Sequence, residues 1–336
     1  MPNASRVTAI HPCMAVEGGR ITIQGHDFAV DRPTIPEVRI GDVRARVVFA
    51  SPTALAAIVP SGVDGRATVR VEGVEGETSF VEVGAPFATG LHQVDNPVFD
   101  REGNLYVTYS GTRGQQVPVS IFRVRPNGTR ETFASGIVNA TSTAIDSEGR
   151  LYVSSRFEGT VYRVAPDGTL VPFAGDLGVA CGLAFASDGT LYVGDRSGTV
   201  FRVSRQGQTT AFASLPPSVA AFHLAVGTDD ALYVTAPTLS SYDPIYRVAP
   251  DGAVTARDAG FGRPQGLAFD AAGVLHVIEA LAGVSGLYRV LPDRTPELVL
   301  SGAALVGLAF DPQGGLVVCS SETAYRLTRP MRAPAR

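Results

Sequence analysis

The chain has 336 residues, of which 45% are hydrophobic and 18% are charged, and its formal net charge is −4. This composition is typical of a compact folded protein and excludes an intrinsically disordered chain. Because phosphate contact needs clustered basic side chains and the sequence has no long basic run, nucleic-acid binding is disfavoured. No apolar stretch reaches the roughly 18 residues of a membrane-spanning helix, so no membrane span is predicted.

Residues 1–16 lack the basic start and long apolar core of a secretory signal. The sequence as written therefore predicts a cytoplasmic protein, or a secreted or periplasmic one if a signal has been removed. Two hydrophobic cores are expected for this length. The 37 glycines indicate a β protein rich in turns.

Residues 1–83 are predicted to form a separate domain of short strands. Seven segments alternate apolar and polar residues, which is the pattern of half-buried strands. These segments are 6–10, 20–25, 37–40, 44–49, 54–59, 66–71 and 78–83. Seven strands in about 80 residues indicate an immunoglobulin-like β-sandwich.

The same segment resembles the IPT/TIG family. The resemblance rests on Ile-His-Pro at 10–12, on the stretch 18–28, and on the stretch 51–60. It implies a packing or adhesion module rather than a catalytic domain.

The rest of the chain repeats one three-residue phrase six times. The phrase begins as Leu-Tyr-Val at 105–107 and ends as Leu-Val-Val at 316–318, with leucines 40 to 46 residues apart. A period of about 40 residues, built of short strands and glycine turns, is the signature of a β-propeller with one copy per blade. The alternative is an all-β sandwich whose strands are similar by chance, which six copies in order make improbable.

Each copy contains further strand signals. An apolar segment such as Gly-Leu-Ala-Phe at 182–185 precedes the first phrase, and an aromatic-Arg-apolar phrase such as Tyr-Arg-Val at 162–164 follows it. Asp-Gly and Pro-Asp-Gly turns separate these segments. One blade therefore contains four strands, with the apolar segment as innermost strand a, Leu-Tyr-Val as strand b and Tyr-Arg-Val as strand c.

The sixth copy ends after strand c. The missing strand is predicted near residues 82–89, because Ala-Pro-Phe-Ala-Thr-Gly at 85–90 matches Val-Pro-Phe-Ala-Gly at 171–175. Its pairing with the last strand c would close the ring and leave no exposed sheet edge. The sequence thus predicts an all-β protein with an IPT/TIG domain at 1–83, a six-bladed β-propeller at 84–330, and a tail at 331–336.

The connections between strands indicate which face carries the site. The a-to-b and c-to-d turns lie on one face, which we call the turn face, and are nearly constant in length. The other connections lie on the loop face and vary from the long 108–121 and 235–244 to the short 194–200. Because variable loops on a rigid scaffold usually carry specificity, the site is predicted at the loop-face mouth of the axial channel.

The first residues of each innermost strand are expected to line this channel. Ten positions before the six leucines stand Asp95, Thr141, Cys181, Phe222, Gln265 and Val306, and next along the chain stand Asn96, Ser142, Gly182, His223, Gly266 and Gly307. The ends of strand b are expected to bring Tyr109, Arg156, Asp195, Arg196 and Glu279 to the same rim.

The polar members of this set predict a ligand pocket. The expected ligand-binding residues are Asn96, Tyr109, Thr141, Arg156, Cys181, Asp195 and Arg196. The alternative is a channel whose polar side chains hold only water. The cysteines leave a similar choice. Cys13, Cys181 and Cys319 are too few for a disulfide framework, and the latter two are either small buried residues near the axis or thiols exposed in the channel.

Residues 85–327 resemble two groups of propellers, the NHL-repeat proteins and the senescence-marker/gluconolactonase family. The resemblance rests on the stretches 180–185, 191–196 and 264–269. The gluconolactonase resemblance implies an axial divalent cation, calcium or magnesium, that polarises a lactone carbonyl. It implies Asp95 and Gln265 as metal ligands, in place of the Glu and Asn of the family phrases, and the third ligand has no evident match.

Two hypotheses of different classes follow. In the first, the protein is a gluconolactonase-like hydrolase in which Asp95 and Gln265 hold the metal and His223 or Glu279 assists proton transfer to a lactone or ester. In the second, it is a non-catalytic, NHL-like scaffold that binds a protein or a carbohydrate. The expected partner is accordingly a small molecule or a protein.

Overall fold

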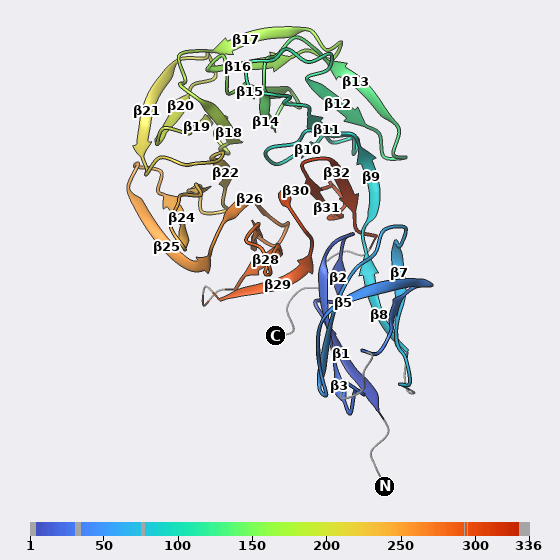
Figure 1. The fold of residues 1–336 in the computed structure, drawn as a ribbon. Coiled ribbons are helices and arrows are strands. Elements are labelled where there is room, and N and C mark those ends of the chain that lie inside the picture. The colour runs from blue at the N-terminus through green and yellow to red at the C-terminus, as the bar shows by residue number, and fades with distance from the viewer. Residues whose placement is uncertain (1–4, 31–34, 75–77, 292, 294, 329–336) are drawn as a thin grey trace.

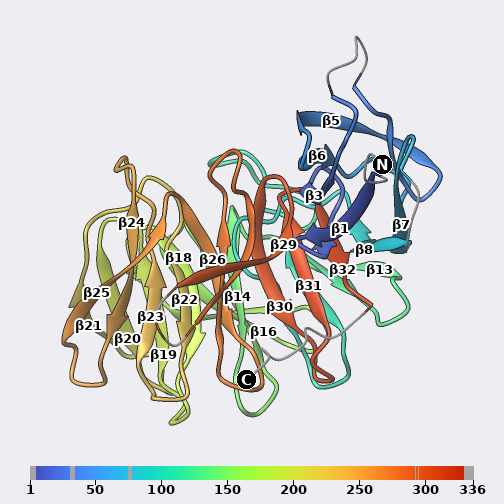
Figure 2. The same ribbon diagram turned by 90° about the horizontal axis from the view of Figure 1, so that it is seen from below.

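The computed structural model describes residues 5–30, 35–74, 78–291, 293 and 295–328, except the side chains of 258 and 259. The predicted tail at 331–336 lies outside these residues. Within them, every regular element is a β-strand, and no helix has the length and apolar character that crossing a membrane requires. The strands form a ring with a smaller domain at one edge (Figure 1), and Figure 2 shows that domain rising above one face of the ring.

The smaller domain contains eight strands. They are β1 Arg6–His11, β2 Met14–Ala15, β3 Arg20–His26, β4 Val38–Ile40, β5 Val43–Ser51, β6 Ala54–Ile58, β7 Gly65–Val71 and β8 Ser79–Val83. Their order in the sheet is β1-β3-β6-β5-β4-β7-β8-β2. Alternation sets the faces, since Ile21 and Ile23 of β3 are buried in the domain core with Leu55 and Val81, while the residues between them are not. Seven of these strands lie within one to three residues of the predicted segments.

The ring contains the remaining strands, in groups of four. The first three groups are β10 Val98–Phe99, β11 Leu105–Thr108, β12 Ile121–Val124 and β13 Arg130–Ala134; β14 Ala140–Ile145, β15 Leu151–Ser155, β16 Thr160–Val164 and β17 Leu170–Ala174; and β18 Ala180–Phe185, β19 Leu191–Asp195, β20 Thr199–Val203 and β21 Thr209–Ser214.

The other three groups complete the circle. They are β22 His223–Val226, β23 Leu232–Thr235, β24 Asp243–Val248 and β25 Val254–Phe261; β26 Pro264–Phe269, β27 Leu275–Glu279, β28 Gly286–Val290 and β29 Pro296–Ser301; and β30 Leu305–Phe310, β31 Leu316–Ser320, β32 Thr323–Arg326 and β9 Ala85–Thr89. The strand expected near 82–89 is β9, which pairs antiparallel with β32. Apolar cores lie between neighbouring groups, as where Ile121 packs with Leu151 and Val153.

The number of separate blades differs from the prediction. Five four-stranded sheets stand alone, whereas six were expected. The strands β26 to β29 have the same order as a blade but belong to a twelve-stranded sheet, because β29 also pairs with β2. The ring is therefore a β-propeller with five separate blades and a sixth four-stranded group shared with the smaller domain.

The joining strand β2 has only two residues and is not predicted from the sequence. It pairs in parallel with β8 on one side and with β29 on the other. Val16, directly after it, donates its backbone N–H to the Ser301 carbonyl at 2.9 Å. Its side chain is buried in the ring core beside Leu300 and Leu327. The two domains thus share a hydrogen-bonded sheet and a hydrophobic contact.

Candidate functional site

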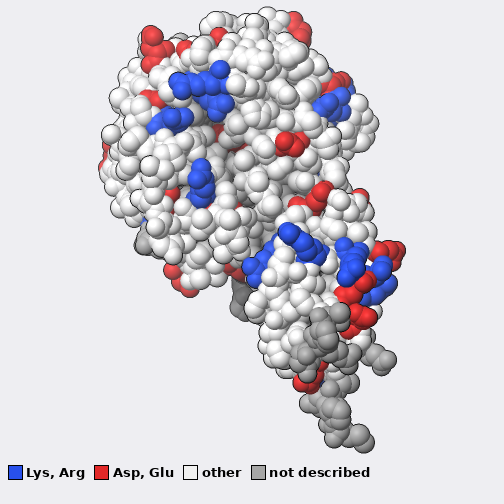
Figure 3. Space-filling view, in the orientation of Figure 1, with Lys and Arg blue, Asp and Glu red and all other residues white. Residues whose placement is uncertain are grey.

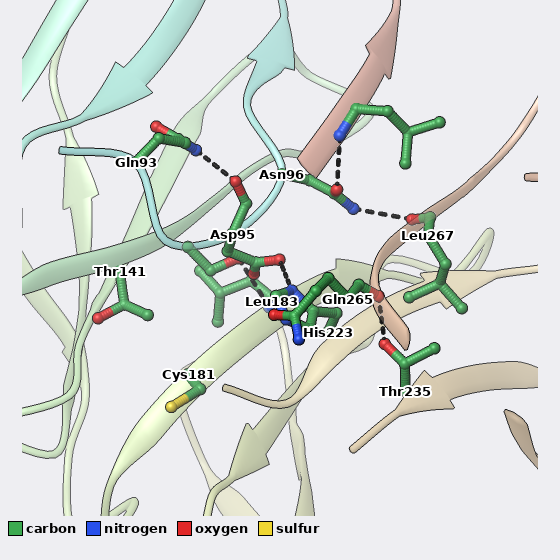
Figure 4. A network of polar contacts seen from close by, with 12 residues as sticks. Gln93, Asp95, Asn96, Thr141, Cys181, Leu183, His223, Thr235, Gln265 and Leu267 are labelled. Atoms are coloured by element: carbon green, nitrogen blue, oxygen red, sulfur yellow. Dashed lines mark hydrogen bonds and ion pairs between the residues drawn. The ribbon is translucent and has the colours of Figure 1, made fainter. Parts of the chain in front are cut away.

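A segment of the first blade crosses the ring axis. Strand β10 begins at Val98, although the periodicity places the start of strand a at Asp95. Residues 93–96 instead leave the sheet and contact other parts of the ring (Figure 4). Asn96 Nδ2 donates to the Leu267 carbonyl at 2.8 Å, and its Oδ1 accepts the Leu308 N–H at 3.0 Å. Asn96 therefore ties this segment to β26 and β30 rather than facing an open channel.

Two glycines make room for residues 93–96, which we call the axial segment. A Cβ on Gly266 would lie 2.2 Å from Asn96 Oδ1, and one on Gly307 would lie 2.6 Å from the Asp95 carbonyl oxygen. Both distances are well below van der Waals contact, so a side chain at either position would displace the segment. Neither Gly266 nor Gly307 has a positive φ, so close approach is the reason for glycine there.

The axial segment ends in a buried pair of ionisable side chains. Asp95 Oδ1 lies 2.5 Å from His223 Nδ1, and the two side chains are 2% and 0% exposed. An ionised carboxylate only accepts hydrogen bonds, so the neutral tautomer that fits this contact carries its proton on Nδ1 and offers Nε2 as an acceptor. Among the residues that the structure describes, His223 Nε2 has no hydrogen-bond partner. The pair therefore has the arrangement of an oriented base, with its basic nitrogen unused.

Gln265 lies beside this pair (Figure 4). The side-chain amide of Gln265 makes no hydrogen bond with the described residues, whereas its backbone carbonyl accepts the Thr235 hydroxyl at 2.5 Å. On the other side of the pair, the Gln93 side-chain amide donates to the backbone carbonyl of Asp95 at 2.6 Å. The side chains of Asp95 and His223 thus meet inside the ring, and Figure 4 draws Gln265 next to them.

Hydroxyl groups fix the innermost strands from one group to the next. Ser154 donates to the Cys181 carbonyl at 2.6 Å, and Thr235 donates to that of Gln265. The Thr108 hydroxyl lies 3.1 Å from Gln93 Oε1 and 3.4 Å from the Thr141 carbonyl. Each hydroxyl stands three positions after a strand-b leucine, and each of the three carbonyls occupies a predicted channel position. These positions therefore hold the ring together through their backbone.

Glu279, predicted to assist proton transfer, and two of the predicted ligand-binding residues are engaged by nearby loop residues. Glu279 accepts the backbone N–H groups of Gly262, Arg263 and Leu281 at 2.6 to 3.1 Å. Asp195 accepts those of Val179 and Ser197 and also bonds the Ser197 hydroxyl. The Thr141 hydroxyl donates to the Asn139 carbonyl at 2.9 Å. The carboxylates of Asp195 and Glu279 therefore hold loop geometry, and their lone pairs are already used.

The other predicted residues surround the mouth of the channel. Cys181 is buried, and burial raises the pKa of its thiol to about 11, so it is neutral at physiological pH. The charges of Asp95, Arg156 and Arg196 all act on this thiol, Asp95 raising its pKa and the two arginines lowering it. Figure 3 shows the ring face hollowed near its centre, with basic side chains around the hollow. Tyr109 packs its ring edge against His92, with ring centroids 6.0 Å apart.

Two residues near the mouth are missed by sequence reasoning. Asn139 is fully buried with φ of 54°, and its side chain bonds the 110–114 loop at four backbone atoms. His92 has a buried Nδ1 with no partner among the described residues, and burial together with the Arg156 charge lowers its pKa. An asparagine in the left-handed region is a recognisable loop signal, but the repeat does not mark either residue.

The described residues do not fit the cation that the gluconolactonase resemblance implies. No three His, Cys, Asp or Glu side chains of the described part gather in a metal-binding arrangement. Asp95 Oδ1 is bonded by His223, and Gln265 supplies only a neutral amide. A divalent hard cation prefers several oxygen ligands including carboxylates, which this set does not provide.

Comparison with known proteins agrees with this architecture. A model of the IPT/TIG domain family matches residues 5–84, and no curated protein is similar in sequence to the chain. An auxiliary nutrient binding protein from Bacteroides ovatus has 14% identity and a TM-score of 0.56, with 97% of this chain and 98% of that one covered.

Two further solved structures have names that refer to enzymes. A catalytically inactive histidine-to-alanine variant of virginiamycin B lyase from Staphylococcus aureus, with quinupristin, has 14% identity and a TM-score of 0.55, covering 98% of this chain and 97% of that one. A structure provisionally named a gluconolactonase has 18% identity and a TM-score of 0.59, covering 73% and 91%. At such identities the likeness shows the fold alone. Residues 5–84 thus form an IPT/TIG domain, and a β-propeller follows it.

Proposed function

We propose that the protein binds a small organic ligand at the loop-face mouth and cleaves an ester or lactone there, with His223 as the general base. The observation that carries this proposal is the free Nε2 of a histidine whose Nδ1 is fixed by a buried carboxylate. An oriented imidazole of this kind accepts a proton from water or substrate. The enzyme names of two structures with this fold add support.

The chemistry uses residues of this chain alone. His223 Nε2 takes a proton from a water molecule while the water oxygen attacks the carbonyl carbon. The ester C–O bond then breaks, and the imidazolium returns the proton to the leaving alkoxide. Asp95 stabilises the imidazolium, and the free Gln265 amide is placed to donate to the carbonyl oxygen. The scheme requires no resident divalent cation.

Access to the base depends on Gln265. His223 is fully buried, so a ligand reaches Nε2 only if a neighbouring side chain moves. Figure 4 draws Gln265 next to it, and because its amide is not held by hydrogen bonds to described residues, a change of its rotamer is the opening that we propose. Gln265 belongs to the β26 to β29 group, which we count as the fifth of six blades. We propose that the boundary between the two domains lies near residue 84.

A binding protein without catalysis is the second candidate. The complete burial of the pair favours it, because a buried histidine–carboxylate contact can have the structural role of joining two blades and no other. One of the structures with this fold is named a nutrient binding protein. In this case His223 would contribute to the stability of the ring and not to turnover.

The two candidates are separated by a matched pair of substitutions. The chain has a second histidine–carboxylate pair on the turn face, where His276 Nε2 lies 3.1 Å from Asp270 Oδ2. Purified wild type, His223→Gln and His276→Gln would be assayed on 4-nitrophenyl esters and lactones, with and without a chelator. We expect His223→Gln alone to lose turnover by about 100-fold or more, without chelator sensitivity.

Other outcomes would decide against hydrolysis. Absence of turnover in the wild type, or equal turnover in folded His223→Gln, would reject the base and leave the binding function. Chelator-sensitive turnover with a stoichiometric metal would reject the metal-free scheme. Circular dichroism of each variant would verify that the fold is retained.

A further inference from the structure

Three arginines stand on loops of adjacent blades at the loop-face mouth. Arg113 follows β11, Arg156 follows β15 and Arg196 follows β19, each in the connection between strands b and c. Arg156 is half-buried, and the other two are exposed. The connections of three successive blades therefore each present a cation on the same face.

Backbone contacts bring the first two of these arginines together. Asn139 accepts the Gly114 N–H at 2.7 Å and donates to the Thr112 carbonyl at 2.9 Å, so it holds the residues on both sides of Arg113. The carbonyl of Asn139 also accepts the Arg156 N–H at 3.4 Å. One buried asparagine thus fixes the loop of the first blade against the loop of the second.

The third arginine shares their environment. The Arg196 N–H bonds the Val179 carbonyl at 3.2 Å as the Arg156 N–H bonds that of Asn139, so the two arginines hold equivalent places in adjacent groups. In agreement with this, the charges of Arg196 and Arg113 both act on Arg156. Burial is the main cause that lowers the pKa of Arg156, and its two arginine neighbours lower it further. Like charges on the same face repel one another, and a bound anion would relieve this repulsion.

No carboxylate of the described residues forms an ion pair with these arginines, and Glu158, in the same connection as Arg156, instead accepts the Tyr162 hydroxyl at 3.2 Å. No side-chain hydrogen bond or ion pair joins Arg113, Arg156 or Arg196 to a described residue. The ion pairs of the described residues involve other arginines, such as Arg123 with Glu131 and Arg150 with Asp146. The Asp195 carboxylate is nearby in sequence but bonds its own loop. The guanidinium donors of the cluster are therefore free for a ligand.

The same face has an apolar part on other blades. Exposed apolar side chains occur in the loops around β22 to β28, at Val219, Leu239, Tyr242, Leu281 and Val284. Phe157, next to Arg156, is 55% exposed and lies close to Gly114 of the first loop. The face thus combines a cationic region on the first three blades with apolar side chains beside it and beyond it.

We propose that Arg113, Arg156 and Arg196 bind the oxyanion group of an amphipathic organic acid whose apolar body lies over the exposed apolar loops. This inference names the ligand class of the proposed site and rests on its location, while it does not depend on catalysis. Guanidinium groups bind carboxylate and phosphate oxygens in bidentate geometry, which fixes the orientation of the ligand. The ester or lactone carbonyl would then project toward Gln265 and His223, which stand at the starts of innermost strands nearer the axis than the arginine-bearing connections.

The test compares two probes that differ in charge. 8-Anilinonaphthalene-1-sulfonate carries an aromatic body and an anion, and N-phenyl-1-naphthylamine has the same body without the anion. We expect the wild type to bind the sulfonate more tightly, and the double variant Arg156→Gln/Arg196→Gln to weaken it at least tenfold, with the neutral probe unchanged. Arg163→Gln, an exposed arginine of the same blade as Arg156, is the matched control and should bind both probes as the wild type does.

Competition and turnover complete the test. Displacement of the sulfonate by inorganic phosphate but not acetate would identify a phosphorylated ligand, and the reverse a carboxylic acid. Absence of sulfonate binding, or equal affinity in the double variant, would overturn the arginine site even if esters are hydrolysed. Arginine-dependent binding without any turnover would retain the site and reject only the catalytic proposal.

Discussion

Asp95 and His223 are 128 positions apart in the sequence, and their side chains meet at 2.5 Å. Asp95 precedes β10 and His223 starts β22, so two four-stranded groups separate them in each direction around the ring. The pair therefore joins opposite sides of the propeller across its axis. Whether or not it is catalytic, it is a buried contact between distant parts of the chain.

This contact predicts a large effect of Asp95 on stability. Asp95→Ala leaves the buried His223 with both ring nitrogens unpaired, and removal of one partner of a buried pair costs about 3–5 kcal/mol. We expect the free energy of unfolding in urea to fall by about 3 kcal/mol. Asp270→Ala, at the more exposed pair of the turn face, should cost about 1 kcal/mol. An unchanged denaturation midpoint for Asp95→Ala would show that the cross-ring contact does not form.

The hydroxyl contacts that join a strand b to the innermost strand of the next group lead to a second prediction. Ser154→Ala and Thr235→Val each leave a buried carbonyl without its donor, so each should lower the free energy of unfolding by about 1–2 kcal/mol. Ser147→Ala, an exposed serine of the same blade as Ser154, is the control and should change it by less than about 0.5 kcal/mol. Equal losses in all three variants would mean that the contacts across blades contribute nothing specific.

The two glycines that contact the axial segment lead to a third prediction. Gly266→Ala and Gly307→Ala place a Cβ against Asn96 and Asp95, and overpacking of this kind costs about 1–3 kcal/mol. Because displacement of the segment moves Asp95 from His223, any ester turnover should fall as well. Gly175→Ala meets no atom within 4 Å and has no positive φ, so it should behave as the wild type. Wild-type stability of both axial variants would contradict the close approach.

The repeating parts of this fold could be predicted because they obey local rules. Alternation in β3 and the recurring phrases of the ring depend on neighbouring residues, so each strand is visible in a short window. The match between 85–90 and 171–175 is also a local likeness, and it indicated the strand that pairs with β32.

The departures from the repeat depend on residues far away in sequence. The axial segment leaves the sheet because Gly266 and Gly307 admit it, and these lie more than 160 positions downstream of it. The two-residue strand β2 is set by pairing with β29, which no window around Met14 contains. Such long-range contacts also explain why the Asn96 side chain bonds β26 and β30, whereas that of Arg156 has no partner among the described residues. Residue type alone does not distinguish these two outcomes.

The last prediction concerns acid stability and the one blade that replaces a tyrosine by histidine. In three blades a strand-b tyrosine donates its hydroxyl to an aspartate, as Tyr152 does to Asp146 at 3.3 Å. His276 occupies the equivalent position with Asp270 as its partner. Burial lowers the pKa of His276, although Asp270 acts in the opposite direction. The native state therefore keeps this histidine neutral at a pH where the unfolded chain, with an ordinary pKa of about 6.5, takes up a proton.

The sign of the effect follows from proton uptake. Below about pH 6.5 the unfolded state binds more protons than the native state, so stability falls as the pH falls. Between pH 7.5 and pH 5.5 we expect a loss of about 1 kcal/mol from His276, measured as the change in free energy of unfolding in urea. His276→Tyr restores the pattern of the other blades and should remove this part of the loss, while His26→Gln, at an exposed position, should leave it unchanged. An identical pH dependence in wild type and His276→Tyr would show that this histidine is not the neutral, buried group that its position beside Asp270 and Phe310 implies.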